Sequence, residues 1–167
     1  QDVNNAVLRA VSGGPVYVSD GIGKTDPSKL WPLIFRDGRV LRCDQPGLPT
    51  EDCLVHSPRE ERIPLKIWNK YKDAGIVAAF NISANEDTVE GKVSPSDIPV
   101  IKGDKYVVYS HFKKEASIVD KGQSLTFKLD DNKIDLYVIM PVIGRVTPLG
   151  LVNKYISPAA VEDIQIQ

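Results

Sequence analysis

After Gly38 the sequence becomes a series of short apolar runs separated by polar turns, and this pattern restricts the possible folds more than any other. About eight such runs at close spacing are typical of a β-sandwich, whose strands repeatedly cross the domain and turn back. Polar connections at 72–75, 112–115 and 130–133 predict hairpins, and therefore mostly antiparallel sheets. We predict strands at 40–42, 65–71, 76–82, 89–93, 106–111, 116–119, 125–129 and 134–140.

Three further segments complete this part of the chain. Segments 44–52 and 57–64 are too rich in proline, glycine and charge to form regular elements, and we predict that they are loops. The last residues, 161–167, are amphipathic enough to form an edge strand.

The beginning of the chain has a different, α/β character. Apolar residues at helical spacing across 3–11, followed by a Ser-Gly-Gly stop signal at 12–14, predict the end of a helix. The run 15–21 is short and almost wholly apolar, as a strand buried on both faces would be. Asp26, which precedes a proline, predicts the start of a short helix. Because a lone parallel strand needs neighbours, this part of the chain looks cut from a larger α/β unit.

Composition excludes several classes of function. Lys and Arg number 21 against 22 Asp and Glu, so no global field favours nucleic acid or an anionic membrane. The sequence shows neither an apolar run long enough to span a membrane nor a basic, apolar leader, and we expect a cytoplasmic protein. Cys43 and Cys53 are too few for a disulfide scaffold or a zinc knuckle. They are expected to be buried thiols, with one disulfide as the alternative.

Ser19 and Asp20 are the best local candidates for a binding site. Ligands of parallel α/β folds lie beyond the carboxyl ends of the strands, and this pair ends the predicted strand. The alternative is that Asp20 only caps the turn into Gly21. The glycines of 21–25 lack the spacing of a phosphate-binding loop.

The other reactive side chains predict no catalytic or metal centre. Neither His56 nor His111 has a second histidine at ligand spacing, so each is expected to be an ordinary hydrogen-bonded side chain. Acidic pairs such as Glu60 and Glu61 lie in turns and are expected to be solvated. Aromatic residues at alternate strand positions are predicted to pack in the core, with a sugar-stacking platform as the alternative: Trp68, Tyr71, Phe80, Tyr106, Tyr109, Phe112, Phe127 and Tyr137.

Seven segments occur in the same order as blocks of a known family: RAVSGGPVYVSD (9–20), DGRVLR (37–42), PGLPTEDCL (46–54), LKIWNK (65–70), GIVAAFN (75–81), GKVSPSD (91–97) and YVVYSH (106–111). They resemble the family of raffinose synthases, seed imbibition proteins and α-galactosidases within glycoside hydrolase family 36. Each block alone is weak, but their common order makes the resemblance specific. It covers nearly the whole chain and matches the family's carboxyl-terminal portion.

The resemblance implies a catalytic (β/α)8 barrel followed by a carboxyl-terminal β-sandwich. The expected fold is therefore mainly β: an antiparallel β-sandwich preceded by the last helix and strand of the barrel. Residues 1–37 would be the terminal fragment of the barrel, with 16–20 as its last strand, and residues 38–167 would be the sandwich domain. Ser19 and Asp20 would line the sugar pocket. Packing between the two domains would involve Trp31, Leu33, Ile34 and Phe35.

Catalysis in the family uses two aspartates, one in a Lys-x-Asp motif and one in an Arg-x-Ser-Asp-Asp motif. We therefore expect neither catalytic motif in this chain. The resemblance implies that the whole enzyme acts on terminal α-galactosides without a metal or organic cofactor, either as a retaining hydrolase or by raffinose-synthase-like galactosyl transfer. This chain alone would be inactive and would need an upstream catalytic barrel segment.

Two other functions stay open for the sequence. One is a stand-alone carbohydrate-binding sandwich that recognises sugars without cleaving them. The other is a structural subunit that pairs with a separate barrel fragment.

Overall fold

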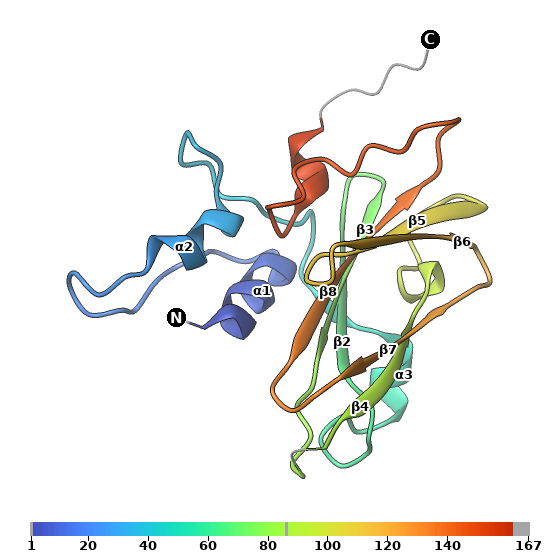
Figure 1. The fold of residues 1–167 in the computed structure, drawn as a ribbon, viewed down its shortest axis with the longest axis horizontal. Coiled ribbons are helices and arrows are strands. Elements are labelled where there is room, and N and C mark those ends of the chain that lie inside the picture. The colour runs from blue at the N-terminus through green and yellow to red at the C-terminus, as the bar shows by residue number, and fades with distance from the viewer. Residues whose placement is uncertain (1, 86, 162–167) are drawn as a thin grey trace.

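The computed structural model describes residues 2–85 and 87–161, and these residues fold mainly into antiparallel β-sheet (Figure 1). The helical elements are short: α1 (Val3–Ser12), α2 (Pro27–Leu30), η1 (Trp31–Leu33), α3 (Glu51–Val55), η2 (Pro95–Asp97) and η3 (Ser157–Ala160). The strands are β1 (Leu48–Pro49), β2 (Leu65–Tyr71), β3 (Ala74–Phe80), β4 (Val89–Val93), β5 (Lys105–Ser110), β6 (Glu115–Asp120), β7 (Leu125–Leu129) and β8 (Ile134–Pro141).

Within the described residues these strands form two sheets. The larger has six strands in the order β1-β2-β3-β8-β5-β6, and the smaller pairs β4 with β7. All neighbouring strands are antiparallel. The order places β3 and β8 in the middle of the large sheet, where both of their faces are covered. Apart from Asp135 on β8, apolar residues therefore follow one another along these two strands.

Two hydrophobic cores lie on opposite faces of the large sheet, with α1 over one face and β4 and β7 over the other (Figure 1). The core beneath α1 includes Val7, Leu33 and Tyr155. The core beneath the small sheet includes Val89 and Phe127. Each large apolar side chain buried in this way stabilises the fold by about 1.5–3 kcal/mol. The molecule is thus a sandwich of a six-stranded and a two-stranded sheet, and α1 covers the other face of the larger sheet.

The ends of α1 follow from local chemistry. The carboxylate of Asp2 accepts a hydrogen bond of 2.7 Å from a backbone amide of the first turn. Gly13 ends the helix at φ 71, a left-handed conformation that glycine adopts without a steric penalty. Asn69 of β2 donates from Nδ2 to the carbonyl oxygens of Val11, at 2.7 Å, and Gln45, at 2.6 Å. This buried amide ties the end of the helix to the large sheet, and the predicted helix is confirmed.

Most of the predicted strands are confirmed. β2, β4 and β7 have the predicted bounds, and β3, β5, β6 and β8 differ from them by at most two residues at either end. The connections at 72–75 and 112–115 join paired strands, as predicted. The hairpin predicted at 130–133 is wrong, because the chain crosses there from β7 in the small sheet to β8 in the large one.

Two predicted strands are wrong. The run 40–42 contributes only an isolated bridge between Ile34 and Val40. The run 16–20 is assigned to no strand, and no described strand pairs with it. A strand requires a hydrogen-bonded neighbour, so apolar composition alone does not make one. The expected last strand of a barrel is therefore an unpaired segment here.

Three smaller expectations have different outcomes. The segment 44–52, predicted as a loop, contains β1 and the start of α3. Apart from Val161, which is in no strand, the predicted edge strand at 161–167 lies outside the described residues. The boundary predicted between residues 37 and 38 stays a prediction. The amide of Leu41 donates to the carbonyl of Leu33 at 2.9 Å, and both side chains belong to the core beneath α1.

Candidate functional site

Ser19 and Asp20 lie in the connection between α1 and α2. Ser19 is exposed and Asp20 is half-buried, while the neighbouring Tyr17 is 63% exposed, with the guanidinium of Arg9 4.1 Å from the centre of its ring. Neither Ser19 nor Asp20 lines the groove described next. Their role in sugar binding therefore stays a prediction.

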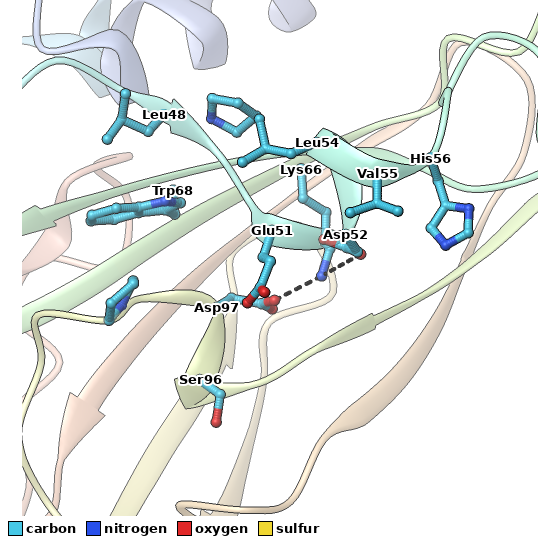
Figure 2. Close-up of a pocket in the computed structure, with 12 residues that line it drawn as sticks. Leu48, Glu51, Asp52, Leu54, Val55, His56, Lys66, Trp68, Ser96 and Asp97 are labelled. Carbon is cyan, nitrogen blue, oxygen red and sulfur yellow. Dashed lines mark hydrogen bonds and ion pairs between the residues drawn. The ribbon is translucent and has the colours of Figure 1, made fainter.

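The largest of the cavities described here is an open groove of about 760 Å³ beside α3 (Figure 2). Its rim is apolar, since Leu48, Leu54 and Val55 are 47%, 71% and 76% exposed. The ring of Trp68, which is 8% exposed, lies at its floor. The complete lining is Leu48, Pro49, Glu51, Asp52, Leu54, Val55, His56, Lys66, Trp68, Ser96, Asp97 and Pro99.

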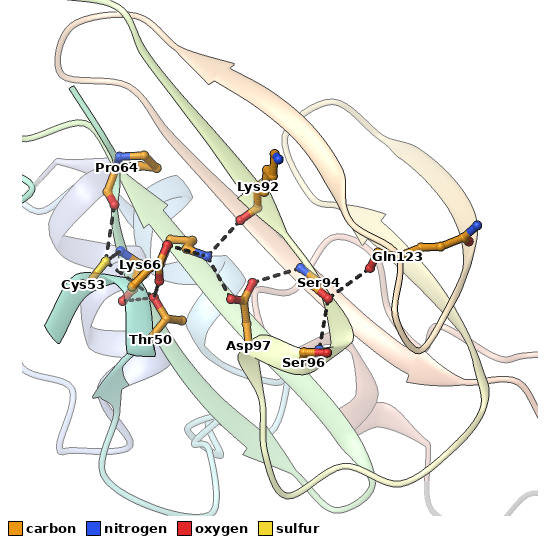
Figure 3. A network of polar contacts seen from close by, with 10 residues as sticks. Thr50, Cys53, Pro64, Lys66, Lys92, Ser94, Ser96, Asp97 and Gln123 are labelled. Carbon is orange, nitrogen blue, oxygen red and sulfur yellow. Dashed lines mark hydrogen bonds and ion pairs between the residues drawn. The ribbon is translucent and has the colours of Figure 1, made fainter. Parts of the chain in front are cut away.

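The polar base of the groove is organised around Lys66 (Figure 3). Its side chain is only 4% exposed, and its ammonium lies 2.8 Å from Asp97 Oδ1 and 3.1 Å from Asp52 Oδ2. It also donates to the carbonyl oxygen of Lys92 at 2.9 Å. One buried cation therefore holds β2, β4, α3 and η2 together.

Local sequence places both carboxylates. Asp97 closes a capping box: Asp97 Oδ2 accepts from the amide of Ser94 at 2.9 Å, while the Ser94 hydroxyl accepts from the amide of Ser96. Asp52 lies in the first turn of α3 and accepts a hydrogen bond of 2.6 Å from the hydroxyl of Thr50. The short helices α3 and η2 therefore each present an acidic side chain to Lys66.

The two carboxylates have opposite pKa shifts. Burial opposes ionisation of Asp52, but the hydroxyl of Thr50 and the ammonium of Lys66 outweigh it and lower the pKa of this carboxyl. Asp97 is more deeply buried, and this burial raises the pKa of its carboxyl even though the ammonium of Lys66 acts to lower it.

This geometry supports an ion-pair clamp and gives no sign of acid–base catalysis. Each oxygen of Asp52 and Asp97 already has a hydrogen-bond or ion-pair partner, and Lys66 lies between the two carboxylates. The Lys-x-Asp spacing does occur at 24–26, 102–104, 128–130 and 133–135. Asp26 caps α2, Asp104 and Asp130 lie outside strands, and Asp135 lies on β8, where it accepts from the hydroxyl of Ser110. No catalytic residue is assigned within the described part of the chain.

The histidines and aromatic residues mostly follow the sequence-based expectations. His56 Nδ1 lies 2.8 Å from Glu61 Oε2 at the surface. His111 is buried instead, and its Nδ1 has no hydrogen-bond partner among the described residues. Core packing is confirmed for Trp68, Phe80, Tyr106, Tyr109, Phe127 and Tyr137, whereas Phe112 is 39% exposed.

Other classes of site were searched in the same residues. No group of three His, Cys, Asp or Glu side chains stands close enough to hold a metal ion in residues 2–85 and 87–161. Over the same ranges no helix has the length and apolar character needed to cross a membrane. Cys43 and Cys53 are free thiols, the first buried and the second half-buried, so the alternative of a disulfide is wrong.

Sequence reasoning did not find the groove. One residue could have indicated it: Lys66 lies on the same inward face of β2 as Trp68, because alternate residues of a strand point the same way. A lysine at such a position requires a buried anion. The partners, however, come from α3 and η2, which lie far from each other in sequence.

The chain matches a family model described as raffinose synthase or seed imbibition protein Sip1 over residues 4–167. It is 34% identical to a galactinol–sucrose galactosyltransferase of Pisum sativum, with 96% of this chain and 24% of the relative covered. It is 32% identical to the galactinol–sucrose galactosyltransferase of Oryza sativa subsp. japonica, with the same shares covered. The chain thus spans about a quarter of the length of these curated relatives.

Solved structures show the likeness of the fold. A Bacteroides fragilis protein assigned as an α-galactosidase superposes with a TM-score of 0.51 at 12% identity, with 82% of this chain and 28% of that chain covered. A second protein from the same organism, assigned as an α-galactosidase/melibiase, also gives 0.51, at 8% identity with 81% and 27% covered. The fold class is therefore mainly β, as expected. With a family match across nearly its whole length, the chain belongs to the family of raffinose synthases and seed imbibition proteins.

Proposed function

We propose that this chain is the carboxyl-terminal part of an enzyme that transfers galactosyl groups between sugars. The observation that carries this proposal is the match to galactosyltransferases over 96% of the chain but only 24% of the relatives. An upstream segment, expected to be a (β/α)8 barrel, would hold the two catalytic carboxylates. This chain would be inactive alone, and the activity would need no cofactor.

The segment between α1 and η1 fits a role in which this chain packs against that barrel. It carries apolar side chains that a solvated surface does not need, among them Tyr17, Val18 and Ile22, which are 63%, 44% and 105% exposed. Of the residues expected between the domains, Trp31 is 44% exposed and Leu33 is only 1% exposed. Leu33 packs within this chain, so that expectation is corrected for Leu33, while Trp31 stays available to a partner.

The chemistry of the whole enzyme is proposed as a double displacement at the anomeric carbon of an α-galactoside. One carboxylate displaces the leaving group while the other protonates the departing oxygen, and the covalent intermediate then passes to an acceptor. Water as the acceptor gives hydrolysis, and a sugar hydroxyl gives transfer. The names of the relatives favour transfer from galactinol to sucrose.

The test compares this chain with a form that carries the upstream segment. Intact mass under denaturing conditions establishes what is present, and turnover of a chromogenic α-galactoside, with and without sucrose, reports activity. We expect no turnover from a single 18.4 kDa species and turnover with an oligosaccharide product from the longer form. Turnover by the 18.4 kDa species, or none by the longer form, would contradict the proposal.

We further propose a cytoplasmic location, which two free thiols fit because the cytoplasm keeps cysteines reduced.

A further inference from the structure

A second pocket, with an excess of positive charge, lies between residues 31–39 and residues 151–154. Its volume is about 480 Å³, and it shares no lining residue with the groove beside α3. The two segments meet directly, since the amide of Tyr155 donates to the carbonyl oxygen of Pro32 at 3.1 Å. The lining residues are Trp31, Phe35, Arg36, Asp37, Arg39, Leu151, Asn153 and Lys154.

Lys154 is a buried cation in this lining. It is only 4% exposed, and its ammonium donates to the carbonyl oxygen of Trp31 and lies 4.5 Å from the centre of the Trp31 ring. No carboxylate of the described residues lies within ion-pair distance of this ammonium. The carbonyl takes one of its three donors, and neither contact supplies a full negative charge. Buried charges in proteins are ordinarily paired, so Lys154 needs an explanation.

The other buried lysine of the described residues shows the ordinary arrangement. Lys66 has two carboxylates within 3.1 Å of its ammonium. Lys154 has a second cation nearby instead, because Arg36 lines the same pocket. Burial, reinforced by the positive charge of Arg36, lowers the pKa of Lys154. Two cations beside one cavity repel each other, and an anion between them would turn this repulsion into attraction.

The remaining charges of the lining do not neutralise this pair. Asp37 is the one carboxylate among the lining residues, and it is already engaged by Arg39. Asp37 Oδ2 lies 2.7 Å from Nε of Arg39, and Asp37 Oδ1 accepts from the amide of Arg39 at 3.0 Å. Three cations against one carboxylate leave the pocket with a net positive charge.

We propose that this pocket binds an oxyanion, a carboxylate or phosphate group, held by the ammonium of Lys154 and the guanidinium of Arg36. Arginine presents parallel donors that match the paired oxygens of either group, and the ammonium adds a point charge. A neutral ligand would leave the two cations uncompensated, and a further cation would be repelled.

The walls of the pocket admit more than a bare ion. Trp31 and Leu151 are 44% and 45% exposed, and Phe35 is half-buried beside them in the lining. The volume of about 480 Å³ falls within the roughly 300–1,000 Å³ of small-molecule sites. An oxyanion with an apolar ring therefore fits the pocket better than inorganic phosphate does. The site does not rest on the proposed galactosyl transfer, because none of its residues is assigned to catalysis.

The test titrates the chain with benzoate and with its neutral analogue benzamide, and follows the indole N–H signals by NMR. The chain has two tryptophans, and Trp68, at the floor of the groove beside α3, is the internal reference. We expect benzoate to shift the signal of Trp31 saturably and to leave that of Trp68 in place. Inorganic phosphate should compete with benzoate, and benzamide should give no saturable shift.

Two arginine variants form a matched pair. Arg36→Gln and Arg42→Gln each remove one positive charge from an exposed side chain of the same segment, but only Arg36 lines the pocket. Arg36→Gln should weaken benzoate binding about threefold, and Arg42→Gln should leave it unchanged. Lys154→Met keeps the apolar stem and should weaken binding at least about tenfold.

Three results would overturn the proposal. They are the absence of a saturable shift with benzoate, equal binding of benzamide and benzoate, and equal affinities for Arg36→Gln and Arg42→Gln. The arginine pair keeps the test decisive even where Lys154→Met does not fold. Because no turnover is measured, failure of the proposed galactosyl transfer would leave these results unaffected.

A form that carries the upstream segment distinguishes two sources of the oxyanion. Benzoate binding by that form would assign the pocket to a free small molecule. Loss of this binding, together with a stability loss for Arg36→Gln in the longer form but not in the chain alone, would assign it to an acidic side chain of the upstream segment. Loss of binding without that difference in stability would count against an oxyanion site in the longer protein.

Discussion

The ammonium of Lys66 lies 2.8 Å from Oδ1 of Asp97, in an ion pair that joins β2 to η2. The side chains are 4% and 14% exposed, so solvent and salt screen the pair weakly. Asp52 adds a second carboxylate at 3.1 Å. The lysine therefore gives up its hydration but gains compensating partners on two other elements.

Replacement of Lys66 by methionine should strongly destabilise the chain. It leaves Asp97 buried without its cation, and the free energy of unfolding is expected to fall by about 3–5 kcal/mol. Urea titration measures this change. Lys70→Met on the same strand is the control: its ammonium lies 3.6 Å from Asp44 with the side chain 32% exposed, so the expected loss is below about 1 kcal/mol.

A second variant covers the case in which Lys66→Met does not fold. The double variant Lys66→Met, Asp97→Asn removes both charges and should recover part of the stability, because no unpaired charge remains at η2. Equal losses for Lys66→Met and Lys70→Met would show that the clamp contributes no more than a surface pair.

Two glycines with similar backbone angles should respond differently to alanine. Gly13 has φ 71 and Gly23 has φ 74. A Cβ at Gly13 would lie 2.1 Å from the carbonyl oxygen of Gln45, whereas one at Gly23 would meet nothing within 4 Å. Gly23→Ala should cost about 1–2 kcal/mol for the left-handed conformation alone. Gly13→Ala should cost about 1–3 kcal/mol more for the overlap, and equal midpoints of thermal unfolding would contradict this.

The sequence predicted the strands whose signals are local. β2, β4 and β7 alternate inward and outward residues between clear turn signals, and their bounds were correct. The turn at 130–133 is also predicted correctly, but the prediction that it closes a hairpin is wrong. Sheet membership depends on distant pairing, here of Gly91 with Phe127 across β4 and β7. A turn can therefore end a strand without returning the chain to the same sheet.

The groove and the buried polar pairs depend on contacts that no local pattern contains. Lys66 and Asp97 are 31 residues apart, and Ser110 and Asp135 are 25 apart. The aromatic alternation correctly predicts that Tyr137 is buried, but it cannot show that the hydroxyl lies beside Asp135. The strand predicted at 16–20 is wrong for a related reason. A strand needs a hydrogen-bonded neighbour, and no described strand pairs with this segment.

His111 should make stability depend on pH. Its ring lies 5.0 Å from Phe112 and 5.2 Å from Tyr155. Burial, with the charge of Lys114, lowers its pKa from 6.5 to about 4. Between these values the unfolded chain binds more protons than the folded one, so stability is lost as the pH falls through this window.

The variant His111→Gln separates this contribution from the rest. Urea unfolding at about pH 7 and about pH 5 should give a smaller difference for the variant than for the unaltered chain. Carboxyl groups with lowered pKa values, such as Asp52, lose their stabilising effect only at lower pH, around and below 3.8. An unchanged difference in the variant would assign the pH dependence to other groups.

The two cysteines should differ in reactivity. Cys43 is 6% exposed in the core beneath α1, and burial raises its pKa to about 12, so its reactive thiolate is scarce near neutral pH. Cys53 is half-buried on α3 and accepts a hydrogen bond of 3.2 Å from the amide of Lys66. Iodoacetamide at about pH 8 should therefore modify Cys53 first in the folded chain, and both residues at similar rates in urea.

Peptide mass spectrometry assigns each modification, and Cys53→Ser provides the control. In that variant the remaining thiol should react only as fast as the core beneath α1 opens, because Cys43 is reached by reagent only after the helix separates from the sheet. Gly13→Ala should then accelerate its modification, since that substitution weakens the end of α1. Rapid modification of Cys43 in the folded Cys53→Ser chain would show that the helix does not seal this core.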